Sequence, residues 1–146
     1  MDRGPNFYAA SCLILTKGGE VLLQRWSKLV WRGGFYGMPA GHIEGTETVF
    51  GAMQREVKEE IGIEVAEKDA VLVHVMHRVS ENRVYFDFFY KTEKWTGKLE
   101  NKESEKCDEL KWFPLDALPK NIIPYLKRVL KQIQKGIFFS EENSNN

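Results

Sequence analysis

Three glutamates are spaced so that they could bind one metal ion together. Glu56, Glu59 and Glu60 stand at i, i+3 and i+4, and on a helix this spacing places three carboxylates on one face within a single turn. Like-charged i,i+4 pairs cost roughly a few tenths of a kcal/mol each, and Arg55 is the one local partner. A bound hard cation would remove this repulsion, and carboxylate oxygens are the ligands that Mg²⁺ and Mn²⁺ prefer. The spacing therefore predicts phosphate chemistry, with an ordinary solvated acidic helix face as the alternative.

The helix that carries these glutamates is predicted over residues 48–61, and Gly62 supplies a natural stop. Its apolar side chains repeat every four residues, at Val49, Met53, Val57 and Ile61. This apolar stripe lies beside the acidic arc, so the core can anchor the helix while the carboxylates stay at its rim. The predicted site is thus fixed on a rigid element.

The remaining sequence predicts strands on both sides of that helix and a second helix near the end. Runs rich in β-branched and aromatic residues predict strands over 7–16, 20–26, 71–79, 83–92 and 110–113, with a short strand near 36–40. Residues 93–108 read as a polar surface loop, and 121–134 show apolar residues at helical spacing. This order predicts an α/β fold in which helices cover both faces of a mixed sheet.

Size and composition are those of one domain, predicted over residues 1–140 and followed by a disordered tail at 141–146. The 21 basic residues balance the 21 acidic ones, so no field of one sign points to a nucleic acid polymer or a membrane. No membrane span or convincing signal peptide is found, which predicts a cytoplasmic location. Cys12 and Cys107 lie on separate apolar segments and are expected to be buried thiols.

The three glutamates belong to a longer pattern, which runs from GHIEGTE at residues 41–47 to REVKEEIGI at residues 55–63. The pattern requires one particular residue at each of seven positions and an aliphatic residue at two more, all at fixed spacing. Such a pattern is expected by chance in well under roughly one in a million chains of this length. This is the signature of the Nudix hydrolases. The order of predicted strands also resembles that family across nearly the whole chain, so the chain is identified as a member.

The resemblance implies an α/β/α sandwich with a mixed β-sheet between helices. It also implies that metal-activated water cleaves a phosphoanhydride bond in a nucleoside diphosphate linked to another moiety. A nucleoside triphosphate or another small nucleotide is the expected substrate, and a monomer or a homodimer is the expected state. The alternative is a Nudix-fold module that binds a nucleotide without cutting it, although such members usually lose signature carboxylates that this chain keeps.

The resemblance assigns the metal site residue by residue. Glu56, Glu59 and Glu60 are the expected ligands of Mg²⁺ or Mn²⁺, and the backbone carbonyl of Gly41 is often a further ligand in the family. Catalytic work is expected to involve two more signature residues, because Arg55 and Glu47 usually orient the ligating carboxylates.

The general base varies within the family, so Glu56 and Glu103 are both candidates here. Glu103 is favoured because Trp95 and Gly97, followed after five residues by Glu103, resemble the equivalent stretch of MutT-type members. Its alternative role is that of an ordinary loop charge, like that of Glu105.

Substrate-binding residues are expected outside the signature. Arg25, at the end of the second predicted strand, matches a position where family members often place a cation against phosphate. Several aromatic rings could stack on a base or could simply belong to the core: Phe35, Trp112 and Tyr125, and also Trp31 and Tyr36. The three histidines, His42, His74 and His77, are expected to be structural.

Overall fold

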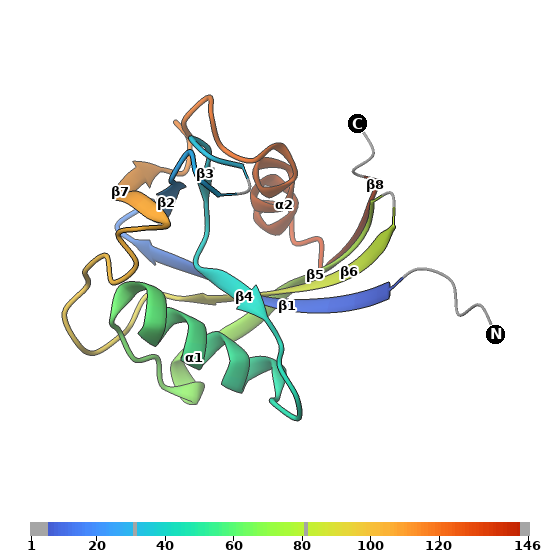
Figure 1. Ribbon diagram of the computed structural model, residues 1–146, viewed down its shortest axis with the longest axis horizontal. Helices are drawn as coiled ribbons and strands as arrows, with labels where there is room; N and C mark the ends of the chain where they lie inside the picture. Colours follow the sequence, from blue (N-terminus) through green and yellow to red (C-terminus); the bar gives the residue numbers. More distant parts are fainter. Residues whose placement is uncertain (1–5, 31, 81, 144–146) are drawn as a thin grey trace.

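The computed structural model describes residues 6–30, 32–80 and 82–143. Its elements are shown in Figure 1, in the order β1 (Asn6–Lys17), β2 (Glu20–Trp26), β3 (Tyr36–Gly37), β4 (Ala40–His42), α1 (Val49–Ile61), a short 3₁₀ turn (Glu67–Asp69), β5 (Val71–Ser80), β6 (Arg83–Thr92), β7 (Cys107–Pro114), α2 (Pro124–Gln134) and β8 (Phe139–Asn143). Among these residues, no helix is long and apolar enough to cross a membrane.

The strands form a mixed sheet in the order β3-β2-β1-β6-β5-β8, with β4 beside β1 and β7 beside β2. β1 runs parallel to β6, whereas β5 and β6 form an antiparallel hairpin, as the sequence predicts. β1 pairs with β2 only next to the hairpin turn, at Thr16 with Val21 and at Lys17 with Glu20. Further along, β2 pairs with β3 at Gln24 and Arg25, and β7 pairs with β2 from Glu20 to Trp26, so the sheet divides after the first hairpin.

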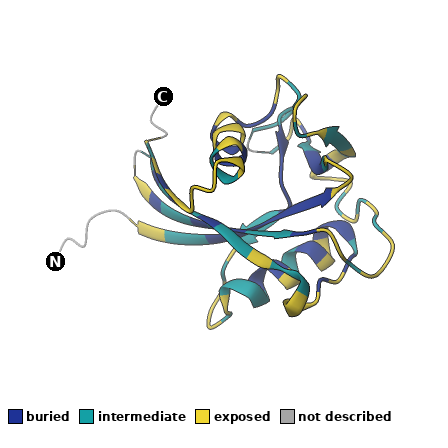
Figure 2. Ribbon diagram, turned by 180° about the vertical axis from the view of Figure 1, so that it is seen from behind, coloured by how far each residue is buried: buried dark blue, intermediate teal, exposed yellow. Residues whose placement is uncertain are grey.

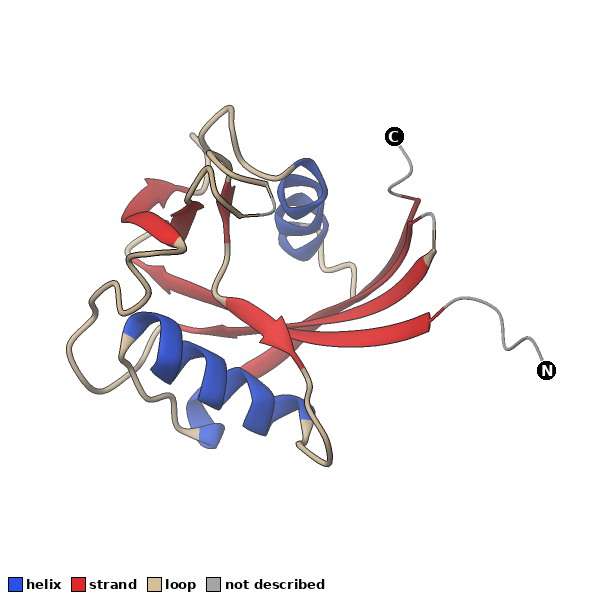
Figure 3. Ribbon diagram, viewed as in Figure 1, coloured by secondary structure: helices blue, strands red, loops and turns tan. Residues whose placement is uncertain are grey.

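The two helices cover opposite faces of the sheet, which confirms the predicted α/β/α sandwich (Figures 1 and 3). Side chains of β1 alternate between the faces, because successive residues of a strand point to opposite sides. Leu13 and Leu15 pack with α1, and Cys12 and Ile14 pack on the α2 side. Figure 2 shows exposed residues on the outward sides of both helices, whereas the central strands consist mainly of buried and intermediate residues. Both faces of β1 are thus core.

Local signals explain why α1 starts and ends where it does. The Thr48 side chain caps the first turn by accepting a hydrogen bond of 2.9 Å from the Gly51 N–H. Gly62 closes the last turn at φ 76, a left-handed conformation that glycine adopts without a side-chain clash. The predicted helix is therefore confirmed, with Thr48 as its cap.

The second helix is shorter than predicted. It begins at Pro124 and not at residue 121, because proline suits the first helical position and keeps the residue before it out of the helical region. The preceding residues pair with β3 instead: the Tyr36 N–H donates to the Asn121 carbonyl, and the Ile123 N–H donates to the Tyr36 carbonyl.

The predicted disordered tail is wrong for residues 141–143, because they belong to β8, which pairs in parallel with β5. β8 satisfies backbone groups along the edge of β5 that would otherwise stay unpaired in this sheet. His74 fixes the start of β8 and the residues before it, because its two ring nitrogens form hydrogen bonds with the Ile137 carbonyl at 2.9 Å and with the Ser140 hydroxyl at 2.8 Å. Residues 144–146 lie outside the described chain.

Candidate active site

Two of the predicted metal ligands lie side by side against β4. A carbon atom added to Gly41 would lie 2.0 Å from the Glu56 carboxyl carbon, so the absence of a side chain at Gly41 makes room for this carboxylate. Glu60 reaches the neighbouring residue, because its Oε2 accepts a hydrogen bond of 3.2 Å from the Ala40 N–H. The same oxygen accepts another of 3.3 Å from the Gln24 amide. The glutamates and β4 thus gather oxygen atoms at one point.

Burial makes this pair of carboxylates unusual. Burial, with the nearby Glu56 charge, raises the pKa of Glu60 to about 9 in the absence of a cation. Burial also raises the pKa of Glu56, although its hydrogen bond from Arg55 acts in the opposite direction. The buried Glu60 and the partly buried Glu56 disfavour each other's charge, so a cation placed between them would be strongly stabilised.

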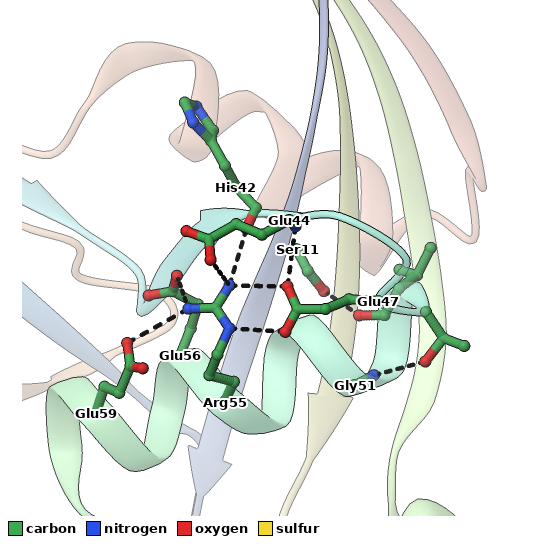
Figure 4. Close-up of polar contacts among 10 residues, drawn as sticks. Ser11, His42, Glu44, Glu47, Gly51, Arg55, Glu56 and Glu59 are labelled. Carbon is green, nitrogen blue, oxygen red and sulfur yellow. Dashed lines mark hydrogen bonds and ion pairs between the residues drawn. The ribbon is translucent and has the colours of Figure 1, made fainter.

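Arg55 organises the surrounding carboxylates (Figure 4). It grips Glu47 with two hydrogen bonds, of 2.7 Å from Nε and 3.0 Å from Nη2. Its Nη1 lies 2.8 Å from Glu56 Oε1 and 3.4 Å from Glu59 Oε2. The hydrogen bonds with Arg55 lower the pKa of Glu47 and those with Glu47 raise the pKa of Arg55, so both groups stay charged. Arg55 therefore fixes the orientation of Glu56.

Glu59 lies apart from the buried pair, because about half of its side chain is exposed and its carboxylate turns toward Arg55. Within the described part of the chain, no three His, Cys, Asp or Glu side chains already converge as a complete metal cluster. The structure thus brings Glu56 and Glu60 together at Gly41 and leaves Glu59 at the rim.

The loop after β6 places Glu103 close to the same carboxylates. This loop covers the end of α1, where the Glu100 N–H donates to the Ile61 carbonyl at 3.1 Å and the Lys102 N–H donates to the Glu60 carbonyl at 3.0 Å. Burial is the main cause of the raised pKa of Glu56 and Glu60, and the negative charge of Glu103 adds to it at both. Glu103 is half-buried, whereas Glu105 is exposed.

A cavity of about 550 Å³ opens beside Gly41, on the sheet face that α2 covers. Its lining includes Trp26, Gly41, His42, Asp87, Phe89 and Tyr125. Gly41 therefore borders both the carboxylate pair and the cavity. The volume lies within the range of about 300 to 1,000 Å³ that is usual for small-molecule sites.

Of the four predicted substrate-binding residues, only Tyr125 lines this cavity. Arg25 instead points to Glu109, with 3.8 Å between Nη2 and Oε2. Phe35 packs against the core on the α2 side, and Trp112 stacks on Trp95 beside the α1 core. These side chains pack around β2 and β7. Their residue types suit substrate binding, but their positions lie outside the cavity.

Other expectations about single residues have clear outcomes. Tyr36 is buried and donates a hydrogen bond to Glu109 at 2.7 Å, so it is a core residue. Both cysteines are buried free thiols, as predicted. His42 stacks on Tyr8, which agrees with a structural role, and Trp31 lies outside the described residues.

The sequence interpretation missed the charged residues that line the cavity, which among the described residues are Arg32, Arg78, Arg83 and Asp87. Arg78 and Asp87 both line it and form a buried ion pair, with 3.0 Å between Nε and Oδ2. The alternation of β6 was the available signal, because Tyr85, Asp87 and Phe89 must share one face of the strand. A charged residue between two aromatic residues on the core-facing side of a strand indicates a polar group within an otherwise apolar surface.

The family model for the NUDIX domain matches residues 5–133. The chain belongs to the Nudix hydrolase family, among its MutT-like members.

Two curated relatives and one solved structure illustrate this membership. The NAD-capped RNA hydrolase NudC of Pseudomonas aeruginosa is 32% identical over 122 residues, which cover 82% of this chain and 40% of NudC. The 8-oxo-dGTP diphosphatase of Proteus vulgaris is 32% identical over 103 residues, covering 70% of this chain and 89% of that enzyme. A MutT Nudix hydrolase from Burkholderia pseudomallei has the same fold, with a TM-score of 0.79 and 24% identity over 87% of this chain and 98% of that chain. The chain thus spans about 40% of the length of NudC.

Proposed function

We propose that the protein hydrolyses a phosphoanhydride bond in a small nucleotide, with a nucleoside triphosphate or a related nucleoside diphosphate derivative as substrate. The observation that carries this proposal is the pair of carboxylates, buried Glu60 and partly buried Glu56, gathered at Gly41 on the border of a nucleotide-sized cavity. A diphosphate at Gly41 would leave the rest of the nucleotide free to enter the cavity. The cytoplasm is the proposed location, on the sequence grounds given above.

The residues present suit a hard divalent cation such as Mg²⁺ or Mn²⁺. Glu56 and Glu60 would hold it, with the Gly41 carbonyl and Glu59 completing an all-oxygen set. The cradle at Gly41 supports this fit, because a side chain there would collide with the Glu56 carboxylate. Such a cation supplies the positive charge that neutralises phosphate oxygens and makes water a better nucleophile.

The chain's own residues position the reacting groups and accept the proton. Water attacks one phosphorus, the bond from that phosphorus to the bridging oxygen breaks, and two phosphate-bearing products leave. We assign the proton of the attacking water to Glu103, which lies near Glu60 but accepts no hydrogen bond from Arg55 among the interactions of the described residues. Arg55 and Glu47 keep the Glu56 carboxylate in place.

Two relatives suggest different substrates. The coverage of 89% of the Proteus vulgaris enzyme favours a free nucleoside triphosphate. The nucleotide cap of an RNA end is the second candidate, because NudC is 32% identical to this chain, although the match covers only 40% of NudC. The balanced charge of this chain, 21 basic and 21 acidic residues, favours the small nucleotide.

The test is a turnover assay with phosphate detection across nucleoside triphosphates, nucleoside diphosphate derivatives and NAD-capped RNA, with Mg²⁺ or with excess chelator. We expect turnover of at least one free nucleotide, dependent on the cation. Undiminished hydrolysis in chelator would contradict the proposed metal site. Binding of nucleotides without any turnover would instead support the non-catalytic alternative.

A further inference from the structure

The Arg78–Asp87 pair lies buried in the cavity wall, where charged groups lose their hydration. Arg78 on β5 and Asp87 on β6 are 8% and 3% exposed, and their side chains are 3.0 Å apart. A buried ion pair gives up hydration and often adds no more stability than an apolar pair of the same size would. Its position in the lining of the cavity points to a ligand as the reason for two buried charges there.

The pair keeps hydrogen-bonding groups that its own contact does not use. The contact joins Nε of Arg78 to Oδ2 of Asp87, whereas a guanidinium carries five N–H donors and a carboxylate has two accepting oxygens. The guanidinium also stacks on two rings, with its central carbon 4.1 Å from the Tyr85 centroid and 4.6 Å from the Tyr125 centroid. Stacking covers the faces of a guanidinium and leaves its in-plane N–H groups to bond a ligand.

The pair therefore presents donors beside acceptors in a balanced, preorganised unit. Trp26 and Tyr125 supply flat apolar surface of the kind that a heterocyclic ring needs. The charges of the pair itself cancel, so the pair can offer hydrogen bonds to an uncharged edge, whereas Arg32 and Arg83 add positive charge elsewhere in the lining of the cavity. An edge with a carbonyl followed by two N–H groups would meet Arg78 with its acceptor and Asp87 with its donors.

We infer that Arg78 and Asp87 determine which base the enzyme accepts, by reading a guanine-type edge in which a carbonyl neighbours two N–H groups. This inference rests on the proposed function, because Gly41 links the cavity to the carboxylate pair. Hypoxanthine lacks the second N–H group, and adenine offers a ring nitrogen and one amino group, so each loses at least one of the three contacts.

The first test uses the unmodified protein and compares equilibrium binding of four mononucleotides by calorimetry: GMP, IMP, AMP and nicotinamide mononucleotide. Because GMP can form one more hydrogen bond to a charged group than IMP, its affinity should be about tenfold higher or more. Methylation of N1 in GMP should weaken binding by a similar factor. Equal affinity for GMP and IMP, or tighter binding of any of the other three, would overturn the inference.

The second test changes the protein with little change of shape. In Asp87→Asn the new amide can still accept the hydrogen bond from Arg78 but presents N–H groups where the carboxylate accepted them. The difference between GMP and IMP should shrink to less than about threefold, as expected for one lost contact. Asp116→Asn, an exposed carboxylate outside the cavity, is the matched control and should keep the difference. A merely structural role of Asp87 would lower both affinities and leave their ratio unchanged.

These outcomes separate the inference from the proposed function. Turnover of nucleotides without a preference for GMP over IMP in binding would sink the inference alone. A preference for GMP in binding, with no turnover of any nucleotide, would sink the proposed function alone. If Asp87→Asn does not fold, the comparison of N1-methylated and unmodified GMP on the unmodified protein still decides.

Discussion

Two arginines of this molecule bond to carboxylates in regions that differ in charge balance. Arg55 bonds to Glu47, Glu56 and Glu59, and the buried Glu60 lies behind them, so negative charge remains in excess at β4. Arg78 pairs with Asp87, and the two charges cancel, while Arg32 and Arg83 also line that cavity. Gly41, which borders both regions, therefore lies between a region with excess negative charge and a cavity whose described lining carries three arginines and one aspartate. A cation with a diphosphate suits the first region, and a base that bonds to the Arg78–Asp87 pair suits the second.

The largest effect is expected when the excess negative charge at β4 is removed. Glu60→Gln keeps the shape but removes the buried charge that would hold a cation, so kcat should fall by about 10³, as expected for the loss of several kcal/mol of metal stabilisation. Glu59→Gln should cost about 10², because its carboxylate lies at the exposed rim. Both are measured by steady-state kinetics with Mg²⁺ in excess.

The control for these variants is Glu64→Gln, an exposed carboxylate just beyond α1 that pairs with Lys58. It should keep nearly full activity. Near-normal kcat in Glu60→Gln, with an unchanged circular dichroism spectrum, would show that the charge excess at β4 does not serve catalysis.

A second change tests the loop that covers α1. Glu103→Gln should lower kcat by about 10² or more, the usual contribution of general acid–base catalysis, while the apparent affinity for Mg²⁺ changes less. Glu105→Gln is the matched control, since Glu105 is exposed on the same loop, and it should be mild. If both variants keep more than about half of the activity, where the base-catalysis range demands a far larger fall, Glu56 becomes the better candidate for the base.

The two regions also differ in how far the sequence alone could locate them. α1 and its carboxylates were predictable, because the cap at Thr48, the four-residue apolar repeat and the stop at Gly62 are all local. The Arg78–Asp87 pair was not, because it depends on the register between β5 and β6 and on the parallel pairing of β1 with β6. Such contacts join residues far apart in the chain and leave no fixed spacing in the sequence.

The error at residues 141–143 has the same origin. Their polar composition predicted a disordered tail, but they pair with the edge of β5. Trp112 and Phe35 have the right chemistry for stacking on a base, but both are partly buried against the core clusters and neither lines the cavity. Residue types predicted the reaction, and strand pairing decided which side chains can meet the substrate.

A smaller effect concerns stability in excess chelator. Burial raises the pKa of Glu60 from 4.5 to about 9, so this carboxyl binds its proton more tightly in the folded chain than in the unfolded one. Its contribution to stability is complete below about 4.5 and is lost as the pH rises through about 9. The melting temperature of the unmodified protein in chelator should therefore fall between pH 5 and pH 9, by at least about 5 °C.

The matched measurement uses Glu60→Gln, which has no proton to lose at this position. Its melting temperature should fall less over the same pH range, and the remaining slope reports the other buried acids, Glu56 and Asp87. Mg²⁺ at pH 8 should raise the melting temperature of the unmodified protein and not that of the variant. Identical pH slopes in the two proteins would contradict the buried charge at Glu60.

The smallest expected effect belongs to a third arginine, which lies outside both regions. Arg25 faces Glu109 at 3.8 Å, and more than a third of each side chain is exposed, so the pair contributes at most about 1 kcal/mol to stability. Since Arg25 is absent from the cavity lining, Arg25→Gln should change the KM of the preferred nucleotide by less than about threefold, an effect within the range of an exposed ion pair. Asp87→Asn, assayed beside it, should raise the same KM by about tenfold if the base is read there. A large rise of KM in Arg25→Gln would instead mean that substrate phosphate reaches the end of β2, and it would restore the role that the strand position of Arg25 first suggested.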